Sequence, residues 1–368
     1  MLVPTTDRLS LRPAAAIGLL HEIAPSGHGA AGGLERHARA LGVAAACVFA
    51  GLLAWRGHDF LAAIERALHA NWGLVLAGAV LEVASVAGYV VLLHRVVSRA
   101  SRGLGLRDSY DISLAGTAAT RLLPTAGLGG AAVTVWALRA RGVRNGEVAE
   151  RLLAFLLLLY SVFVAALGLS GAAVATGLVA TPGGRALGLL GVLLATGLTA
   201  AVLVVLSAPA PLARLLHRVA ARGTGRRGAA LAARAAASLP VLRAALRRTG
   251  TELRGAHPAL LGAIAWWAFD IAVLYALLQA FGAHLAIPVL VLGYFLGTAF
   301  NVVPLPGSLS GGLIGVLIGL GGPAAPVIAA VLGYRAIATW LPAATGVLSL
   351  GRLRASVTRW RAEALVPA

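Results

Sequence analysis

Residues 121–130 read Arg-Leu-Leu-Pro-Thr-Ala-Gly-Leu-Gly-Gly and interrupt an apolar run that extends from Ile112 to Leu138. A second apolar run, Ile287–Leu320, is interrupted at residues 301–312, which read Asn-Val-Val-Pro-Leu-Pro-Gly-Ser-Leu-Ser-Gly-Gly. Proline removes a backbone donor and glycine permits unusual dihedral angles, so neither run is expected to form one continuous helix. We predict that each run folds as two half-length helices joined by a bend.

The two interruptions resemble one another in residue type and in order. With two extra residues in the second copy, the aligned pairs are Pro124 with Pro304, Gly127 with Gly307, Gly129 with Gly311 and Gly130 with Gly312. The flanking segments correspond too: the residues are the carboxylates Glu82 and Asp270 before the broken runs and the arginines Arg151 and Arg335 after them. This order predicts an internal repeat with halves at about 72–170 and 258–350.

The composition is that of a membrane protein. Of the 368 residues, 59% are hydrophobic and 12% charged, and the mean hydropathy is +0.86. Soluble domains are about 25% charged. Full spans, which need about 20 residues each, are expected at Leu41–Trp55, Trp72–His94, Val148–Leu169, Leu187–Leu206, Ala259–Phe281 and Pro323–Leu350. If the broken runs are re-entrant hairpins, the fold is an all-α polytopic bundle of six spans and two hairpins.

The distribution of basic residues orients this bundle. All 31 basic residues are arginines, against 13 acidic residues. The predicted topology places 25 of them on one side, in the N-terminal tail, Arg95–Arg107, Arg139–Arg144, Arg214–Arg254 and Arg352–Arg361. Cytoplasmic loops carry the excess of positive charge, so we expect a multi-pass protein of the cell membrane with both termini in the cytoplasm. The positive charge is then explained by the orientation of the protein and by attraction to anionic lipid headgroups. This interpretation excludes nucleic acid as a partner.

The sequence predicts one membrane domain with short polar ends. The expected parts are a disordered cytoplasmic tail at 1–33, the membrane domain at 34–352 and a cytoplasmic tail at 353–368. The basic segment 212–256 is interpreted either as an interfacial amphipathic helix or as a solvated linker. A single cysteine, Cys47, excludes a disulfide framework and a cysteine-based metal site.

In this topology the two hairpins enter the membrane from opposite sides. Such an inverted repeat of broken helices is typical of secondary transporters, whose substrate sites lie where the half-helices meet. Unwound backbone is stable in a membrane only where protein or a wet cavity covers it, and a half-helix N-terminus binds anions such as phosphate. The alternative is that both runs are ordinary kinked helices.

Charged residues inside the membrane are the candidate site. Glu82 and Asp270 lie near the middle of their spans, where an ionised group costs at least about 2.5 kcal/mol without a partner. Arg121 and Arg335 are the expected counter-charges and, as guanidinium groups, suit a lipid phosphate. The carboxylates either hold these arginines or contact a cationic headgroup; the alternative is a pair of structural bridges. Arg151 lies nearer the interface, where its side chain can snorkel.

The chain resembles a known family. The pattern Leu-Leu-Pro124-x-x-Gly-x-Gly, then Glu150-Arg151, Pro304-x-Pro-Gly, Gly-Tyr334-Arg335 and Leu341-Pro342 is similar to the flippase-like transmembrane domain of lysylphosphatidylglycerol synthases. The resemblance covers roughly Leu41 to Leu350, and only 18 residues follow it. It therefore implies a free-standing member without the aminoacyl-transferase domain. One departure is Gly129-Gly130-Ala131-Ala132, where family members often have a carboxylate and a basic residue. The resemblance therefore does not identify the headgroup of the substrate lipid.

The resemblance implies a membrane lipid translocase. Its substrate would be an anionic or aminoacylated phospholipid, or a polyprenyl-phosphate-linked lipid. The substrate-binding candidates are Glu82, Arg121, Pro124, Gly127, Gly129, Gly130, Arg151, Asp270, Pro304, Gly307, Gly311, Gly312 and Arg335. No metal or cofactor motif is present, and no nucleophile accompanies the carboxylates, so an intramembrane enzyme is the weaker alternative. The other alternative is a membrane subunit that anchors or regulates a lipid-modifying enzyme or glycosyltransferase.

Overall fold

The fold is seen in a computed structural model. It describes residues 70–98, 104–122, 128–207, 239–240, 242–251, 258–300 and 307–363, and the isolated positions 211, 214, 215 and 218. The span expected at Leu41–Trp55 lies outside the described residues, as do Pro124, Gly127 and Pro304.

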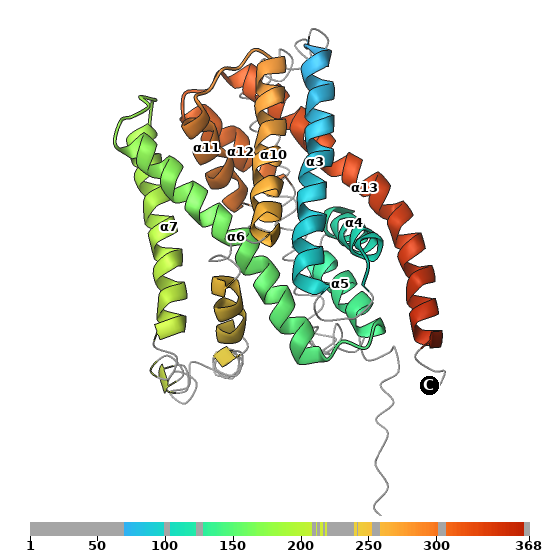
Figure 1. The fold of residues 1–368 in the computed structure, drawn as a ribbon. Coiled ribbons are helices and arrows are strands. Elements are labelled where there is room, and N and C mark those ends of the chain that lie inside the picture. The colour runs from blue at the N-terminus through green and yellow to red at the C-terminus, as the bar shows by residue number, and fades with distance from the viewer. Residues whose placement is uncertain are drawn as a thin grey trace, which may run out of the picture. The chain divides into compact units, whose positions relative to one another are not determined.

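The described residues form helices and no strands (Figure 1). The helices are α3 (Trp72–Val97), α4 (Leu106–Leu122), α5 (Leu128–Ala140), α6 (Asn145–Ala175), α7 (Gly184–Ser207), α10 (Pro258–Ala280), α11 (Ile287–Ala299), α12 (Ser308–Gly319) and α13 (Ala324–Glu363). A further helical segment covers 242–251. Five helices, α3, α6, α7, α10 and α13, are long and apolar enough to cross a membrane. The prediction of an all-α polytopic membrane bundle is confirmed.

The first broken run folds as a helical hairpin, α4–α5. Near its open end, Arg141 Nη2 lies 3.5 Å from Asp108 Oδ2. Near the bend, the Gly130 N–H donates to the Thr120 hydroxyl over 2.9 Å. The first contact joins residues 33 positions apart and the second joins residues 10 positions apart. The two helices are therefore antiparallel neighbours, and the chain leaves the hairpin at the end where it entered. The prediction of two half-length helices is confirmed for this run.

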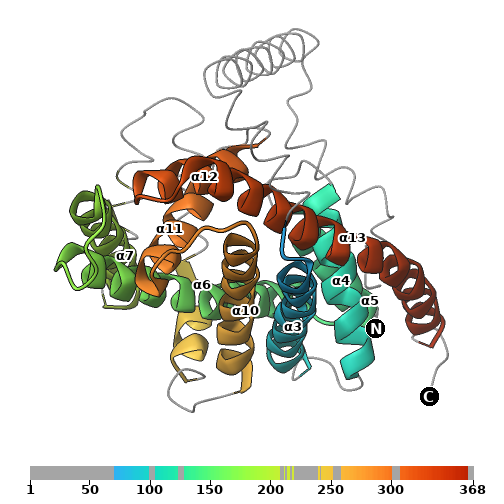
Figure 2. The ribbon, with the colours of Figure 1, turned by 90° about the horizontal axis from the view of Figure 1, so that it is seen from above.

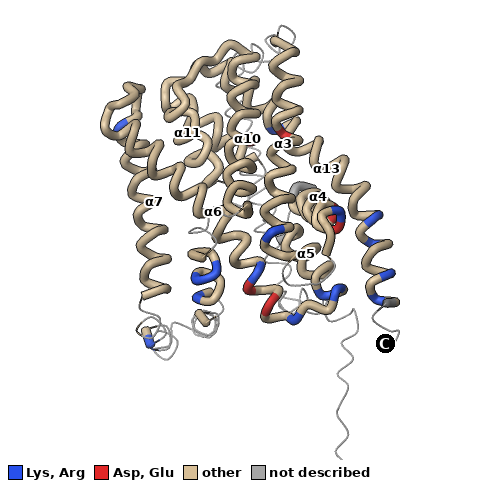
Figure 3. Tube along the Cα trace, viewed as in Figure 1, with Lys and Arg blue, Asp and Glu red and all other residues tan. Residues whose placement is uncertain are grey.

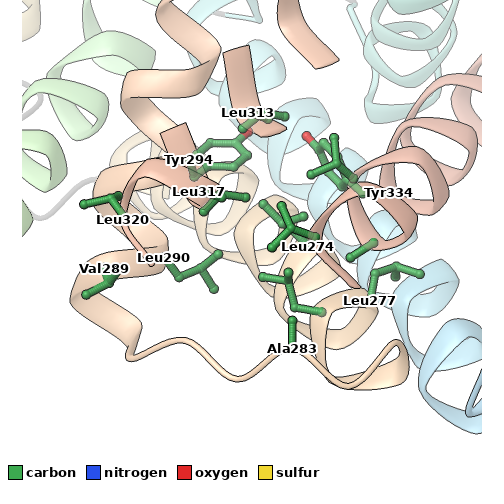
Figure 4. Packing of buried hydrophobic residues seen from close by; sticks show 14 of the residues in the cluster. Leu274, Leu277, Ala283, Val289, Leu290, Tyr294, Leu313, Leu317, Leu320 and Tyr334 are labelled. Atoms are coloured by element: carbon green, nitrogen blue, oxygen red, sulfur yellow. The ribbon is translucent and has the colours of Figure 1, made fainter. Parts of the chain in front are cut away.

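The second broken run, α11–α12, repeats this geometry. Gly293 packs against Leu317, and Gly297 packs against Gly312 nearer the bend. Gly307 precedes α12 with φ +81°, in the left-handed region that favours glycine. The apolar side chains of this hairpin lie against α10 and α13 (Figure 4).

Helices α3 and α10, which start the two halves, pack antiparallel on each other. The Asn71 N–H donates to the Ala280 carbonyl over 3.2 Å, so the start of α3 meets the end of α10. Farther along, a Cβ on Gly88 would lie 2.7 Å from the Trp266 nitrogen, which shows that the backbones are in direct contact. An inverted repeat requires its equivalent helices to be antiparallel, as these two are.

Each hairpin packs on the last helix of the other half. In the first, α4 lies along α13: Asp111 accepts a hydrogen bond from Arg352 Nε over 2.9 Å, and Gly346 contacts Leu114. In the second, α11 lies along α6, where the rings of Phe163 and Phe295 are 4.6 Å apart. The view in Figure 2 shows α3 and α10 side by side, with α13 running past both. The two halves are therefore interlocked.

The last helix is longer than the sequence predicted. The span was expected to end at Leu350 with a polar tail from 353, whereas α13 continues to Glu363. Leu353, Val357 and Trp360 recur at helical spacing, and all three are buried. The Arg141 guanidinium stacks 4.2 Å from the Trp360 ring centre. Packing against the first hairpin thus extends the helix beyond the apolar run.

We expect Gly262→Ala to destabilise the α3–α10 pair. The new Cβ would lie 2.7 Å from the Gly88 carbonyl oxygen and from the Leu92 nitrogen, both backbone atoms. Overpacking of this kind costs about 1–3 kcal/mol, so the unfolding temperature in detergent, followed by circular dichroism, should fall.

The matched control is Gly315→Ala in α12, because a Cβ there meets no atom within 4 Å. This variant should unfold at the wild-type temperature or above it. Equal unfolding temperatures for Gly262→Ala and wild type would contradict the close helix contact.

Candidate functional site

The centre of the candidate site is the Asp270 carboxylate of α10. Two tyrosine hydroxyls donate to its Oδ2 atom: Tyr334 from α13 over 2.6 Å, and Tyr294 from α11. Asp270 is 3% exposed, Tyr334 3% and Tyr294 2%. Figure 4 shows the two tyrosines among the leucines of the core. One carboxylate thus connects three helices of the second half.

The second oxygen of the Asp270 carboxylate, Oδ1, differs from Oδ2 in its hydrogen bonding. Asp270 Oδ1 is buried and has no hydrogen-bond partner among the described residues. A buried carboxylate oxygen without a donor is costly when the group is ionised. The two tyrosine hydroxyls offset part of this cost, and a proton or a cationic group at Oδ1 would offset the rest.

The second membrane carboxylate, Glu82, lies at the level of Asp270. It is fully buried on α3. Two contacts between α3 and α10 lie on either side of this level. One joins Gly88 to Trp266, and the other joins Gly78 to Leu277. The antiparallel register therefore places Glu82 opposite Asp270, as an inverted repeat would place two equivalent residues.

Arg335 lies where the last helix passes this pair. Its neighbour Tyr334 bonds Asp270, and a Cβ on Gly78, one turn before Glu82, would lie 3.8 Å from Ile337. Three predicted residues, Glu82, Asp270 and Arg335, therefore lie on helices that meet at one level. Asp270 itself is stabilised by the hydrogen bonds of two tyrosines.

The other two predicted arginines are Arg121 and Arg151. Arg121 is in the last turn of α4, and its side chain is outside the described atoms. Arg151 is 5% exposed, so it does not snorkel into solvent as the sequence had indicated. Its Nη1 donates to the Val96 carbonyl at the end of α3 over 2.7 Å, and its Nη2 donates to Glu147 over 2.9 Å. Arg151 thus ties α6 to α3.

The glycines of the two bends have packing roles that can be read from the structure. A Cβ on Gly130 would lie 2.9 Å from the Gly116 carbonyl oxygen, and one on Gly312 would lie 2.6 Å from the Gly297 carbonyl oxygen. These are equivalent contacts in the two hairpins. Gly129 and Gly311 precede them, and a Cβ on Gly311 would meet open space.

The sequence reasoning missed Tyr294. The sequence did contain a sign of it, which is a repeated Gly-Tyr dipeptide. Gly293-Tyr294 and Gly333-Tyr334 both occur in apolar segments that follow Asp270. Both tyrosines reach the same carboxylate oxygen. A buried carboxylate needs donors, so a search for tyrosines in neighbouring spans would have found both.

Aromatic side chains close one side of this carboxylate. The Trp267 indole N–H donates to the Leu159 carbonyl over 2.8 Å, and its ring lies 5.5 Å from Phe295 and 6.1 Å from Tyr294. These contacts join α10 to α6 and α11. The Asp270 carboxylate is therefore buried beside an aromatic cluster that joins three helices.

A comparison with protein families decides the relationship of the chain. Residues 39–346 match the lysylphosphatidylglycerol synthase TM region. The chain belongs to this family. The match includes every candidate residue and both hairpins, so the resemblance seen in the motifs is confirmed. No curated protein matches the chain. Membership makes it a membrane protein of a lipid-related family, and the matched region is the membrane part of those synthases.

We expect Asp270→Ala to destabilise the family fold more than Asp270→Asn. Alanine leaves two buried tyrosine hydroxyls without their acceptor, at about 1–3 kcal/mol each, whereas asparagine keeps a carbonyl oxygen. Thermal unfolding in detergent should separate the two variants.

A matched control is Tyr275→Phe, because Tyr275 is 40% exposed on the same helix. It should unfold like wild type. If Asp270→Ala unfolds at the same temperature as Asp270→Asn, the two tyrosine bonds do not stabilise the core.

Proposed function

We propose that the protein is a lipid translocase of the cell membrane. Its substrate is a lipid with a phosphate headgroup: an anionic or aminoacylated phospholipid, or a polyprenyl-phosphate-linked lipid. The observation that carries the proposal is the pair of hairpins, each packed on the last helix of the other half, with the buried carboxylates Glu82 and Asp270 at one level of the paired helices α3 and α10. Broken helices around buried charges are the arrangement in which transporters bind substrates.

The charge distribution supports the proposed orientation. In Figure 3 most of the described arginines gather at one end of the bundle, on α5, the start of α6, the segment 242–251 and the end of α13. Few charges lie in the other half. By the positive-inside rule the arginine-rich end faces the cytoplasm, and both termini are then cytoplasmic.

The proposed transport site lies at the level of Glu82. The guanidinium groups of Arg335 and Arg121 bind the phosphate, because a guanidinium stays charged and offers paired donors. The N-terminus of α12, after Gly307, adds the positive end of a helix dipole for the same anion. The carboxylates position the arginines or receive the amine of an aminoacylated headgroup. Acyl chains stay in the bilayer while the headgroup passes along the hairpins.

Two other functions make different predictions. An intramembrane enzyme would convert the lipid chemically, with Glu82 and Asp270 as acid and base. A membrane subunit would anchor or regulate a lipid-modifying enzyme or glycosyltransferase and move nothing alone. The protein reconstituted in vesicles distinguishes them: a translocase exchanges fluorescent lipid between leaflets, an enzyme changes its mass, and a subunit does neither.

We expect Arg335→Ala and Arg121→Ala to lower leaflet exchange by more than about tenfold, since each removes a charged phosphate contact. Exchange is measured by dithionite quenching of fluorescent phosphatidylglycerol in vesicles. The control is Arg354→Ala, an exposed arginine near the end of the same α13, which should exchange lipid at the wild-type rate. Wild-type exchange in both test variants would remove these arginines from the mechanism.

We expect Glu82→Gln to unfold like wild type and to lose exchange. Glutamine keeps the shape of the side chain and one acceptor oxygen and removes the charge, so transport suffers while packing is kept. Loss of the folded protein, judged by size-exclusion chromatography, would instead assign Glu82 to a structural bridge.

The re-entrant topology is tested by cysteine labelling in a Cys47→Ala background. Asp108 and Arg141 lie at the open end of the α4–α5 hairpin. Single cysteines at these two positions should both react with an impermeant maleimide from the cytoplasmic side. Labelling from opposite sides would contradict the hairpin topology and remove the main support for transport.

A further inference from the structure

A cavity of about 270 Å³ lies away from the buried carboxylates, between the end of α3, the first third of α6 and the segment 242–251. Its lining residues are Arg95, Val96, Arg151, Ala154, Leu158, Arg248 and Thr251. Three of these seven are arginines, contributed by three different helices. The volume is several times the share of one water in the liquid, about 30 Å³, so a tetrahedral anion fits with its solvent.

The arginines of this arginine-lined cavity keep unused donors. Arg248 Nη1 is buried without a hydrogen-bond partner in the described part of the chain, although Arg248 Nε lies 3.4 Å from Glu150. Arg95 takes part in no ion pair among the described residues. A buried guanidinium donor without an acceptor is costly, and an anion in the cavity would accept from Arg248 Nη1, while the exposed Arg95 adds positive charge at its edge.

The charge balance at the cavity is positive. Glu147 neutralises Arg151 and Glu150 neutralises Arg248, while Arg95 has no carboxylate partner in the described part of the chain. Neither carboxylate lines the cavity. The two carboxylates therefore orient the guanidinium groups of Arg151 and Arg248 without lining the cavity themselves. Arg151 is fixed further by its bond to the Val96 carbonyl.

We propose that this cavity binds a phosphate group, and that its source is the headgroup of an anionic phospholipid. Guanidinium forks from several directions match the oxygens of a phosphate. The same wall continues with apolar residues: Ala154 and Leu158 follow Arg151 at one and two turns along α6. Phosphate at the arginines and apolar surface beyond them fit an amphiphile better than a free ion. The proposal does not rest on translocation.

The test measures binding to the full-length protein in neutral detergent by native mass spectrometry. The probes are phosphatidylglycerol and, in a separate arm, inorganic phosphate. The test variant is Arg95→Gln/Arg248→Gln, which leaves the buried Arg151 in place. We expect phosphatidylglycerol to bind about 10- to 100-fold more weakly, because two charge-assisted contacts are lost.

The matched control is Arg247→Gln, next to Arg248 on the same segment but exposed and outside the cavity. It removes one positive charge and should change the affinity less than about threefold. Size-exclusion profiles and unfolding temperatures show whether each variant is folded; if the double variant is not, Arg95→Gln and Arg248→Lys are measured singly.

Each outcome decides the question. Arginine-dependent binding of phosphatidylglycerol supports the proposal, and saturable arginine-dependent binding of inorganic phosphate without the lipid assigns the same site to a soluble phosphate instead. Equal lipid affinity in the folded test and control variants overturns it. Lipid exchange is measured separately, so a protein that binds here but does not transport would refute the translocase proposal and leave this site intact.

Discussion

The direct contact between the backbones of α3 and α10 is the constraint on which the rest of this structure depends. Gly88 and Gly262 allow the two helices to approach until backbone meets backbone. In a membrane, helices associate through close packing and hydrogen bonds, since lipid is as apolar as their side chains. The close approach fixes the antiparallel register and brings Glu82 and Asp270 to one level. A larger residue at the contact would force these two helices apart locally and weaken their packing.

The interlocked hairpins follow from that pairing. A half-length helix has too little apolar surface of its own to be stable in the bilayer, and its bend needs cover. Each hairpin finds this cover on the last helix of the opposite half: α4 on α13 and α11 on α6. Small residues again allow the contact, Gly346 in one case, while the aromatic pair Phe163 and Phe295 fills the other. Neither half would bury its hairpin alone.

Much of this architecture could be predicted from the sequence, because its determinants are local. Apolar length predicts spans, and proline with glycine predicts bends. The partners of the buried charges could not be predicted, since they depend on contacts distant in sequence: Tyr294 and Tyr334 reach Asp270 from 24 and 64 residues away. Arg151 seemed free to snorkel until the Val96 carbonyl, 55 residues before it, was seen to accept its hydrogen bond. The extension of α13 likewise depends on burial against the first hairpin.

The length of α13 has a mechanical consequence. Its 40 residues extend about 60 Å. Within it, Tyr334 is anchored beside Asp270 and Arg352 is anchored beside Asp111. Between these anchors stands Pro342, which removes one backbone hydrogen bond and is a usual place for a helix to bend. The helix therefore has two clamped arms on either side of Pro342, and a change of angle at that residue would move the first hairpin relative to Asp270.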